Sequence, residues 1–125
     1  HDNRNYEDAW GEKWQGLLEV YPEDNNKQYQ TNYDSQANQL LAKNLKGKLL
    51  LAHGLLDDNV PPSNTLLVVQ ALIEAEKDFD LILFPKERHG FGNKRYFMKK
   101  RWDYFVEHLH GVEPPEDFYF DANIN

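Results

Sequence analysis

Two short polar stretches of the 125-residue sequence carry groups that could do chemistry. Asp57 and Asp58 follow one apolar run, and His89 follows a second and precedes Gly90. In open α/β sheets, functional side chains gather in the loops just past the carboxyl ends of the strands. Neighbouring loops of this kind can bring an aspartate and a histidine together, so that the carboxylate accepts the imidazole N–H and fixes its tautomer. The pattern predicts that Asp57 and His89 form an acid–base pair.

The apolar runs before these loops have the pattern of buried strands. Within residues 48–53 and 80–85 the apolar residues follow one another without alternation, which is typical of strands covered on both faces in a parallel sheet. The segment between them, residues 65–77, is densely apolar with one narrow polar stripe, so it predicts a largely buried helix.

Three further segments predict helices. Residues 94–110 place an apolar stripe on one side of a helix that Gly111 ends, and we expect Trp102 and Phe105 to pack on the sheet. Residues 35–44 predict a short helix capped by Ser35. Near the start, three aromatic residues spaced by four share one helical face: Tyr6, Trp10 and Trp14.

The order helix, strand, helix, strand, helix predicts an α/β fold with one right-handed βαβ unit. Both strands have the composition of interior strands, yet nothing in this sequence is left to cover their outer edges. We therefore expect two parallel strands with flanking helices that belong to a larger sheet. A second copy of the chain, or more of the same protein, is expected to cover the open edge.

Composition narrows the classes of function. The formal charge is −7 and the acidic residues are spread along the chain, whereas nucleic acid requires a clustered basic face. The one basic cluster, residues 99–101, has Asp103 and Glu107 nearby and is interpreted as a solvated face. Without cysteine the chain has no disulfides or thiol nucleophiles. His108 and His110 point apart on a helix, so no metal site is predicted, and no cofactor is expected.

Three stretches of sequence carry a resemblance to a known family. His53-Gly54-Leu55-Leu56-Asp57-Asp58-Asn59-Val60 resembles the His-Gly-x-x-Asp-Asp-Asn-Val motif of the prolyl oligopeptidase family, in its dipeptidyl peptidase IV branch. Residues 87–91 look like the histidine loop of that branch. Residues 4–6 and 12–16 are similar to the segment after the strand that follows the nucleophile elbow. The resemblance extends from residue 1 to about residue 118, in the same order and spacing.

The resemblance implies an α/β-hydrolase fold and a serine-type peptidase that works by Ser-Asp-His acyl transfer with dipeptidyl-peptidase-like specificity. Asp57 is then the acid and His89 the base, while Asn59 bonds a substrate carbonyl. The pocket for the residue before the cleaved bond is lined by three side chains: Tyr6, Trp10 and Val60. Asn3 stands where the family commonly has an aromatic residue, so the resemblance does not fix a preference for proline.

The same resemblance implies that residues 1–125 are the C-terminal segment of a peptidase catalytic domain, without the nucleophile elbow and propeller domain. No Gly-x-Ser-x-Gly occurs, and the two serines, Ser35 and Ser63, have no flanking glycines. We expect the nucleophile upstream of His1 and no activity from this chain alone. Expected partners are a peptide substrate, the upstream part of the domain and the propeller, with a homo-oligomer left open. A periplasmic or secreted location is favoured over a cytoplasmic one.

Plainer interpretations stand beside these. Asp57 and Asp58 could cap the following helix, and His89 could be a surface histidine. His53 lies in a strand and is interpreted as a hydrogen-bonded core residue. Trp14 is interpreted as core, and Asn59 could be a turn residue only.

Two rival functions remain for the whole protein. One is an acylaminoacyl peptidase or oligopeptidase of the same family. The other is a non-catalytic homologue that keeps the fold as an interaction module.

Overall fold

The computed structural model of the chain describes residues 2–22, 30–118 and 120. Its strands are β1 (Leu50–Gly54) and β2 (Asp80–Phe84), and its α-helices are α1 (Asp8–Gln15), α2 (Asn38–Leu41), α3 (Ser63–Glu74) and α4 (Arg95–Phe105). Short 3₁₀ helices cover Asn3–Asn5, Asp34–Gln36 and Ala42–Asn44, and a π-helical turn covers Val106–His110.

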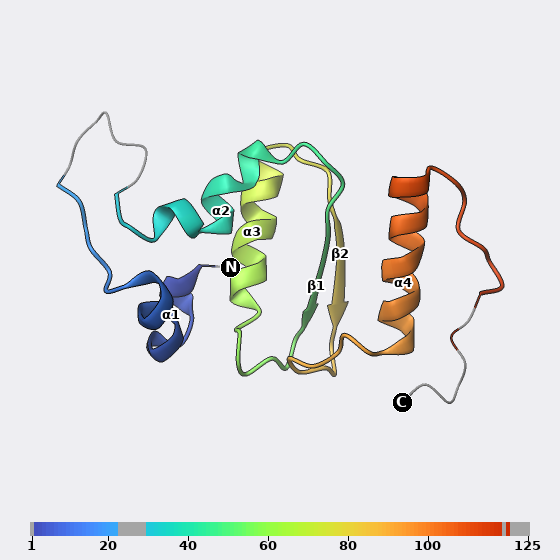
Figure 1. Cartoon of the computed structure of the whole chain (residues 1–125), viewed down its shortest axis with the longest axis horizontal. Coiled ribbons are helices and arrows are strands. Elements are labelled where there is room, and N and C mark those ends of the chain that lie inside the picture. Colours follow the sequence, from blue (N-terminus) through green and yellow to red (C-terminus); the bar gives the residue numbers. More distant parts are fainter. Residues whose placement is uncertain (1, 23–29, 119, 121–125) are drawn as a thin grey trace.

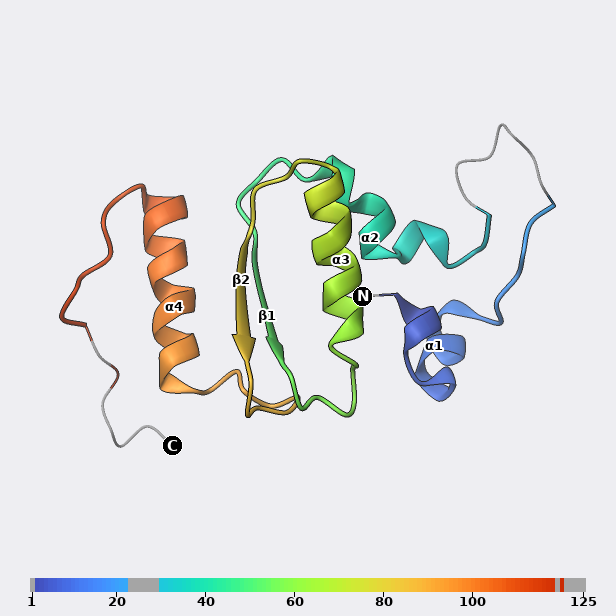
Figure 2. The same ribbon diagram turned by 180° about the vertical axis from the view of Figure 1, so that it is seen from behind.

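The two strands form a parallel pair, in register from Leu50 opposite Asp80 to Gly54 opposite Phe84. Parallel neighbours need a crossover connection, which α3 supplies. α3 lies on one side of the strands and α4 on the other, with α1 and α2 beyond α3 (Figures 1 and 2). The predicted βαβ unit with flanking helices is confirmed.

The predicted boundaries of both strands and of the last helix lie within two residues of those observed, whereas α3 ends at Glu74 rather than at the predicted residue 77. The predicted helix over residues 35–44 is three short pieces, because Ala37 takes an extended backbone (φ −77°, ψ 108°) that separates the first 3₁₀ turn from α2. Gly111 ends the last helix as predicted. Its φ of 69° lies in the left-handed region, which glycine adopts without a Cβ penalty.

The apolar core is small. The buried apolar side chains are Tyr33, Ala37, Ala42 and Leu72. The prediction of a largely buried α3 is wrong, since Leu66, Leu67 and Ile73 are all more than 40% exposed. The apolar residues of α3 lie on more than one side of the helix, so several of them stay exposed.

The predicted packing of α4 is also wrong. Trp102 and Phe105 are 55% and 49% exposed. α4 faces β1 and β2 across a hollow of about 550 Å³, toward which it turns Tyr96, Lys100 and Tyr104. The side of α4 that carries Trp102 and Phe105 therefore points away from the strands.

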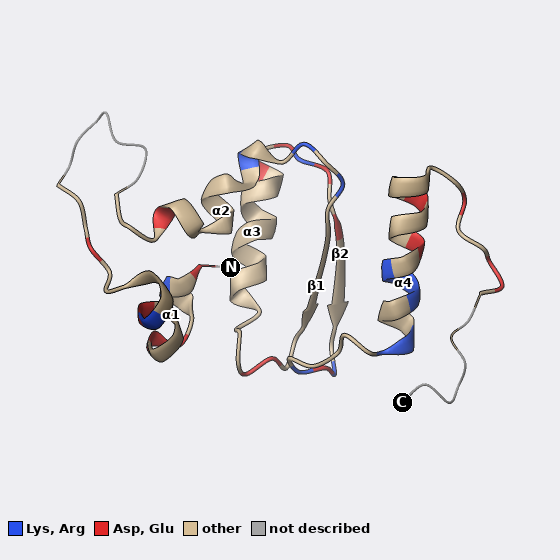
Figure 3. Cartoon of the chain, in the orientation of Figure 1, with Lys and Arg blue, Asp and Glu red and all other residues tan. Residues whose placement is uncertain are grey.

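The basic cluster at residues 99–101 lies in the middle of α4, with Asp103 later in the same helix and Glu107 in the following π-helical turn. Figure 3 shows basic and acidic residues along this segment. Lys99 Nζ pairs with Asp103 at 2.8 Å. The charges on this helix are thus mixed in sign.

Among the described residues, no helix has the length and apolar content needed to cross a membrane.

Candidate active site

The loop after β1 holds Asp57 in a local network. Asp57 is 8% exposed, and its Oδ1 accepts hydrogen bonds from the backbone N–H groups of Asn59 and Val60, each at 2.9 Å. Burial by itself would raise the pKa of Asp57. The bonds from Val60, His89 and Asn59 outweigh burial and hold that pKa below its ordinary value, so the carboxylate is ionised at neutral pH.

His89, in the loop after β2, reaches the other oxygen of this carboxylate. Its Nδ1 lies 2.9 Å from Asp57 Oδ2, and the side chain is 57% exposed. The predicted meeting of Asp57 and His89 is confirmed. An ionised carboxylate can only accept, so Nδ1 carries the proton in this bond. Nε2 makes no hydrogen bond to any described residue, which leaves its lone pair available to take a proton.

A glycine lets the two loops approach. A Cβ on Gly54 would lie 2.5 Å from the carbonyl oxygens of both Glu87 and Arg88, a distance that real Cβ atoms do not adopt. Across this contact Leu55 N–H donates to Phe84 O at 2.9 Å, and Leu56 N–H donates to Glu87 O at 3.0 Å. The glycine of the His-Gly pair therefore fixes how close the histidine loop comes to the acid loop.

Side chains also hold both loops. Phe91 stacks on Phe84 with 4.7 Å between ring centroids, which anchors the chain just after His89. Arg88 pairs with Asp58 across the loops, although both side chains are more than two-thirds exposed. Such an exposed pair contributes little to stability.

His53 closes the acid loop onto α3. The side chain is 8% exposed, with Nδ1 2.6 Å from Thr65 Oγ1 and Nε2 3.0 Å from Val60 O. The prediction of a hydrogen-bonded core histidine is confirmed. Because Val60 O can only accept, Nε2 carries the proton and Nδ1 accepts from the threonine hydroxyl.

The predicted substrate residues of the N-terminal segment surround a hollow of about 270 Å³. It is lined by Asn3, Tyr6, Trp10 and Trp14. Tyr6 lies just after the first 3₁₀ turn rather than within α1, yet it faces the same hollow. The prediction that Trp14 is core is wrong, because this side chain is 74% exposed. None of the described elements packs over that face of α1.

Tyr6 connects this hollow to the acid loop. Its hydroxyl donates to Asn59 Oδ1 at 3.0 Å, and Asn59 N–H donates to Asp57. Tyr6, Asn59, Asp57 and His89 thus form one continuous hydrogen-bonded series. Val60 takes part through its backbone, and its side chain is not among those that line the hollow.

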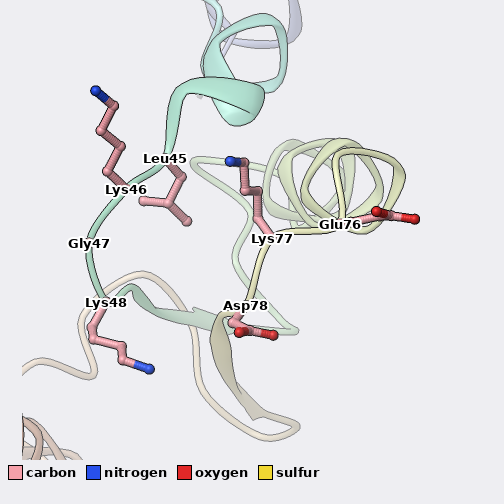
Figure 4. A pocket seen from close by; sticks show the side chains of 7 residues that line it. All are labelled: Leu45, Lys46, Gly47, Lys48, Glu76, Lys77 and Asp78. Atoms are coloured by element: carbon pink, nitrogen blue, oxygen red, sulfur yellow. The ribbon is translucent and has the colours of Figure 1, made fainter.

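A second hollow, of about 300 Å³, lies at the opposite end of the strands. Its lining residues precede β1 and β2, and they are Leu45, Lys46, Gly47, Lys48, Glu76, Lys77 and Asp78. In Figure 4 the three lysine ammonium groups point in different directions, with two carboxylates among them. They do not converge on one ligand, so this hollow is not a candidate for the chemistry.

Sequence reasoning missed a buried polar cluster behind Tyr6. Asp2 is 3% exposed and pairs with Arg4 at 2.7 Å, and Arg4 also reaches Asp34 at 2.7 Å. Asn64, 2% exposed, bonds the same segment. Asp2 and Arg4 are close in sequence, but their bonds to Asp34 and Asn64 join segments 30 or more residues apart, which no local pattern marks. Within the described residues, no group of three or more His, Asp or Glu side chains could hold a metal ion.

The chain is similar to known proteins in both sequence and structure. Residues 1–112, most of the chain, match the Prolyl oligopeptidase family. The chain belongs to this family. A dipeptidyl peptidase 4 structure from Porphyromonas gingivalis is 30% identical, with a TM-score of 0.65 over 84% of this chain and 14% of that one. An acylaminoacyl peptidase structure from Pyrococcus horikoshii is 29% identical, with a TM-score of 0.58 over 69% of this chain and 15% of that one.

Two dipeptidyl peptidases match over shorter stretches of sequence. Mouse dipeptidyl peptidase 8 is 44% identical over 43 residues, which is 34% of this chain and 5% of that protein. Dipeptidyl peptidase family member 1 of Caenorhabditis elegans is 34% identical over 59 residues, 47% of this chain and 7% of that protein. The chain thus aligns with only a small share of the length of its relatives. Its fold is that of part of an α/β-hydrolase.

Proposed function

We propose that this chain supplies the acid and the base of a serine peptidase that hydrolyses peptides by acyl transfer. The observation that carries the proposal is the 2.9 Å contact between Asp57 Oδ2 and His89 Nδ1. It commits Nδ1 to the carboxylate and leaves Nε2 for the nucleophile, which is the arrangement of a Ser-His-Asp triad. The serine comes from the rest of the protein, because the 125 residues hold no Gly-x-Ser-x-Gly.

In this proposal the serine, His89 and Asp57 each have one role in the reaction. The serine hydroxyl attacks the peptide carbonyl as His89 Nε2 removes its proton, and the same imidazolium protonates the leaving amine. Water, activated by His89, then attacks the acyl-enzyme and releases the acid product. Asp57 stays ionised throughout and stabilises the imidazolium, in keeping with its lowered pKa.

The preferred specificity in this proposal is release of dipeptides from a free N-terminus. The support is the set of side chains beside the acid loop. The aromatic rings of Tyr6 and Trp10 border a hollow, which in this proposal takes a small apolar residue. Asn59 accepts from the Tyr6 hydroxyl, and in this proposal its side-chain amide N–H donates to a substrate carbonyl. The dipeptidyl peptidases among the relatives favour this choice, and the acylaminoacyl peptidase supports the rival specificity.

The test compares matched peptides with the full-length protein. Dipeptide release is expected from peptides with Pro or Ala in second position and a free N-terminus, with loss of cleavage when that N-terminus is acetylated. Preferential cleavage of the acetylated peptide would establish the acylaminoacyl rival instead.

Two histidine variants distinguish loss of a catalytic group from a general defect in the same assay. His89→Ala should abolish turnover, whereas His110→Ala, at an exposed histidine that ends the π-helical turn Val106–His110, should leave it unchanged. A correctly folded protein that cleaves neither peptide, and in which a serine-directed fluorophosphonate labels nothing, would support the non-catalytic interaction module.

A further inference from the structure

The side chain of Asn64 holds both ends of the turn that precedes Tyr6. Asn64 is the second residue of α3 and is 2% exposed. Its Oδ1 accepts from Asp2 N–H at 3.3 Å, and its Nδ2 donates to Asn5 O at 3.0 Å. Asp2 is the N-cap of the 3₁₀ turn Asn3–Asn5, and Asn5 is the last residue of that turn. One buried amide thus fixes the start and the end of this turn against α3.

The turn and the acid loop meet at the same end of α3. Thr65, next to Asn64, bonds His53, and His53 in turn bonds Val60 O. Adjacent residues of one helix therefore hold the two segments that carry Tyr6 and Asn59. The contact between those segments is the 3.0 Å bond from the Tyr6 hydroxyl to Asn59 Oδ1.

A separate set of bonds keeps the turn itself folded. Asp2 caps it by accepting from Arg4 N–H at 3.0 Å, and Asp2 also accepts from Arg4 and Gln39 side chains. Arg4 reaches Asp34. These bonds join the turn to residues 34–39 and not to the acid loop. Loss of the Asn64 amide should leave the turn intact while removing its bonds to α3.

From this geometry we propose that Asn64 is a positioning residue for substrate selection. It sets where Tyr6 lies relative to Asn59, and so governs recognition of the residues that precede the cleaved bond. The side-chain bonds of Asn64 go to the turn, whereas those of Asp57 come from its own loop and from His89, so the acid–base pair keeps its own bonds without Asn64. The inference rests on the proposed peptidase function.

The test uses two variants of the full-length protein and two substrates. Asn64→Leu keeps the branched shape and removes both bonds, whereas Asn64→Asp keeps the acceptor for Asp2 N–H and loses the donor to Asn5 O. The first substrate is a dipeptidyl p-nitroanilide, which needs the region around Tyr6 and Asn59. The second is p-nitrophenyl acetate, whose acetyl group requires the triad but little of that region. Ser63→Ala, an exposed neighbour on α3, is the control.

We expect Asn64→Leu to lower kcat/KM for the dipeptide substrate by roughly 10- to 100-fold, mainly through KM, as displacement of a substrate-positioning group does. Asn64→Asp should show a smaller loss, and hydrolysis of p-nitrophenyl acetate should stay within about 2-fold for both variants. Ser63→Ala should match the wild type on both substrates.

Equal losses on the two substrates would overturn the inference, because a general structural defect would impair both. Wild-type values on both would overturn it as well. If Asn64→Leu does not fold, the substrate ratio of Asn64→Asp decides. A wild-type protein that turns over neither substrate would instead refute the peptidase proposal itself, and the positioning role with it.

Discussion

At the carboxyl ends of β1 and β2 the buried side chains are polar, whereas along α4 the exposed side chains are apolar. The first region has His53, Asp57 and Asn64, each less than 9% exposed and each bonded to named partners. The second has Trp102 and Phe105, each about half exposed.

The two regions differ in what a short chain can supply. A buried polar group needs only a few partners with correct geometry, as Asp57 finds in the backbone of Asn59 and Val60 and Asn64 finds in the backbone of Asp2 and Asn5. An apolar stripe instead needs a large complementary surface, because its stabilisation scales with the area removed from water. This chain bonds the Asp57 carboxylate from within its own loops and leaves its apolar faces open.

The largest expected effect is the loss of activity when the carboxylate of Asp57 is replaced. Asp57→Asn in the full-length protein should lower kcat about 10⁴-fold, because an amide at this position favours the wrong imidazole tautomer and cannot stabilise the imidazolium. Steady-state kinetics on a dipeptide substrate measure this. Asp58→Asn is the matched control, since Asp58 is 69% exposed and pairs only with exposed Arg88 among the described residues. If both variants lose activity equally, Asp57 is not the acid.

The second-largest effect is expected for a buried apolar residue of α3. Leu72 and Ile73 are neighbours on α3, but Leu72 is 1% exposed and Ile73 is 57% exposed. Leu72→Ala should cost about 2–5 kcal/mol in free energy of unfolding. Ile73→Ala should change it by no more than about 0.5 kcal/mol. Denaturant unfolding of the two variants gives both values. A similar large cost for both would mean that the open face of α3 is covered in the whole protein.

The polar loops could be predicted from the sequence better than the packing of the apolar faces. The Asp57–His89 contact could be predicted because topology places the ends of consecutive parallel strands side by side. The strands themselves could be predicted from their uninterrupted apolar runs. The packing of Trp102 could not, because periodicity shows that a stripe exists and not which surface it meets.

The long-range polar partners were equally out of reach of sequence reasoning. The bonds of Asn64 to Asp2 and Asn5 span about sixty residues, and no local pattern marks them. The role of Gly54 also depends on a distant segment, because the atoms that exclude a Cβ belong to Glu87 and Arg88.

The third effect concerns the approach of the two loops. Gly54→Ala places a methyl group 2.5 Å from two backbone carbonyl oxygens, so the histidine loop must move. Overpacking of this kind costs about 1–3 kcal/mol of stability. Displacement of His89 should also lower kcat/KM by about 100-fold. Gly92→Ala is the control, because a Cβ there meets no atom within 4 Å. Unfolding curves and kinetics of the pair separate the two consequences, and unchanged activity in Gly54→Ala would show that the loop contact does not position His89.

The smallest effect is a pH dependence in the buried cluster behind Tyr6. Burial of Asp2 would raise its pKa, but hydrogen bonds from Arg4 and Gln39 hold it below the ordinary value of 3.8. A lowered pKa in the folded state means that the unfolded chain binds the proton more readily, so ionised Asp2 stabilises the fold above pH 3.8. That contribution is lost as the pH falls through the folded-state pKa. Asp2→Asn removes the charge that Arg4 contacts, so the variant should be less stable than wild type by about 1.5–3 kcal/mol near neutral pH.

The difference between the two proteins should then shrink as the pH drops below 3.8. Denaturant midpoints measured from pH 7 down to pH 2 test this prediction. The carboxylates of Asp34 and Asp57 also have lowered pKa values and are unchanged in the variant, so both proteins should lose stability in acid. The wild type should lose more of it, by the share that Asp2 contributes. Parallel pH profiles, with a constant gap at every pH, would mean that the Asp2–Arg4 pair holds the turn by shape alone and not by charge.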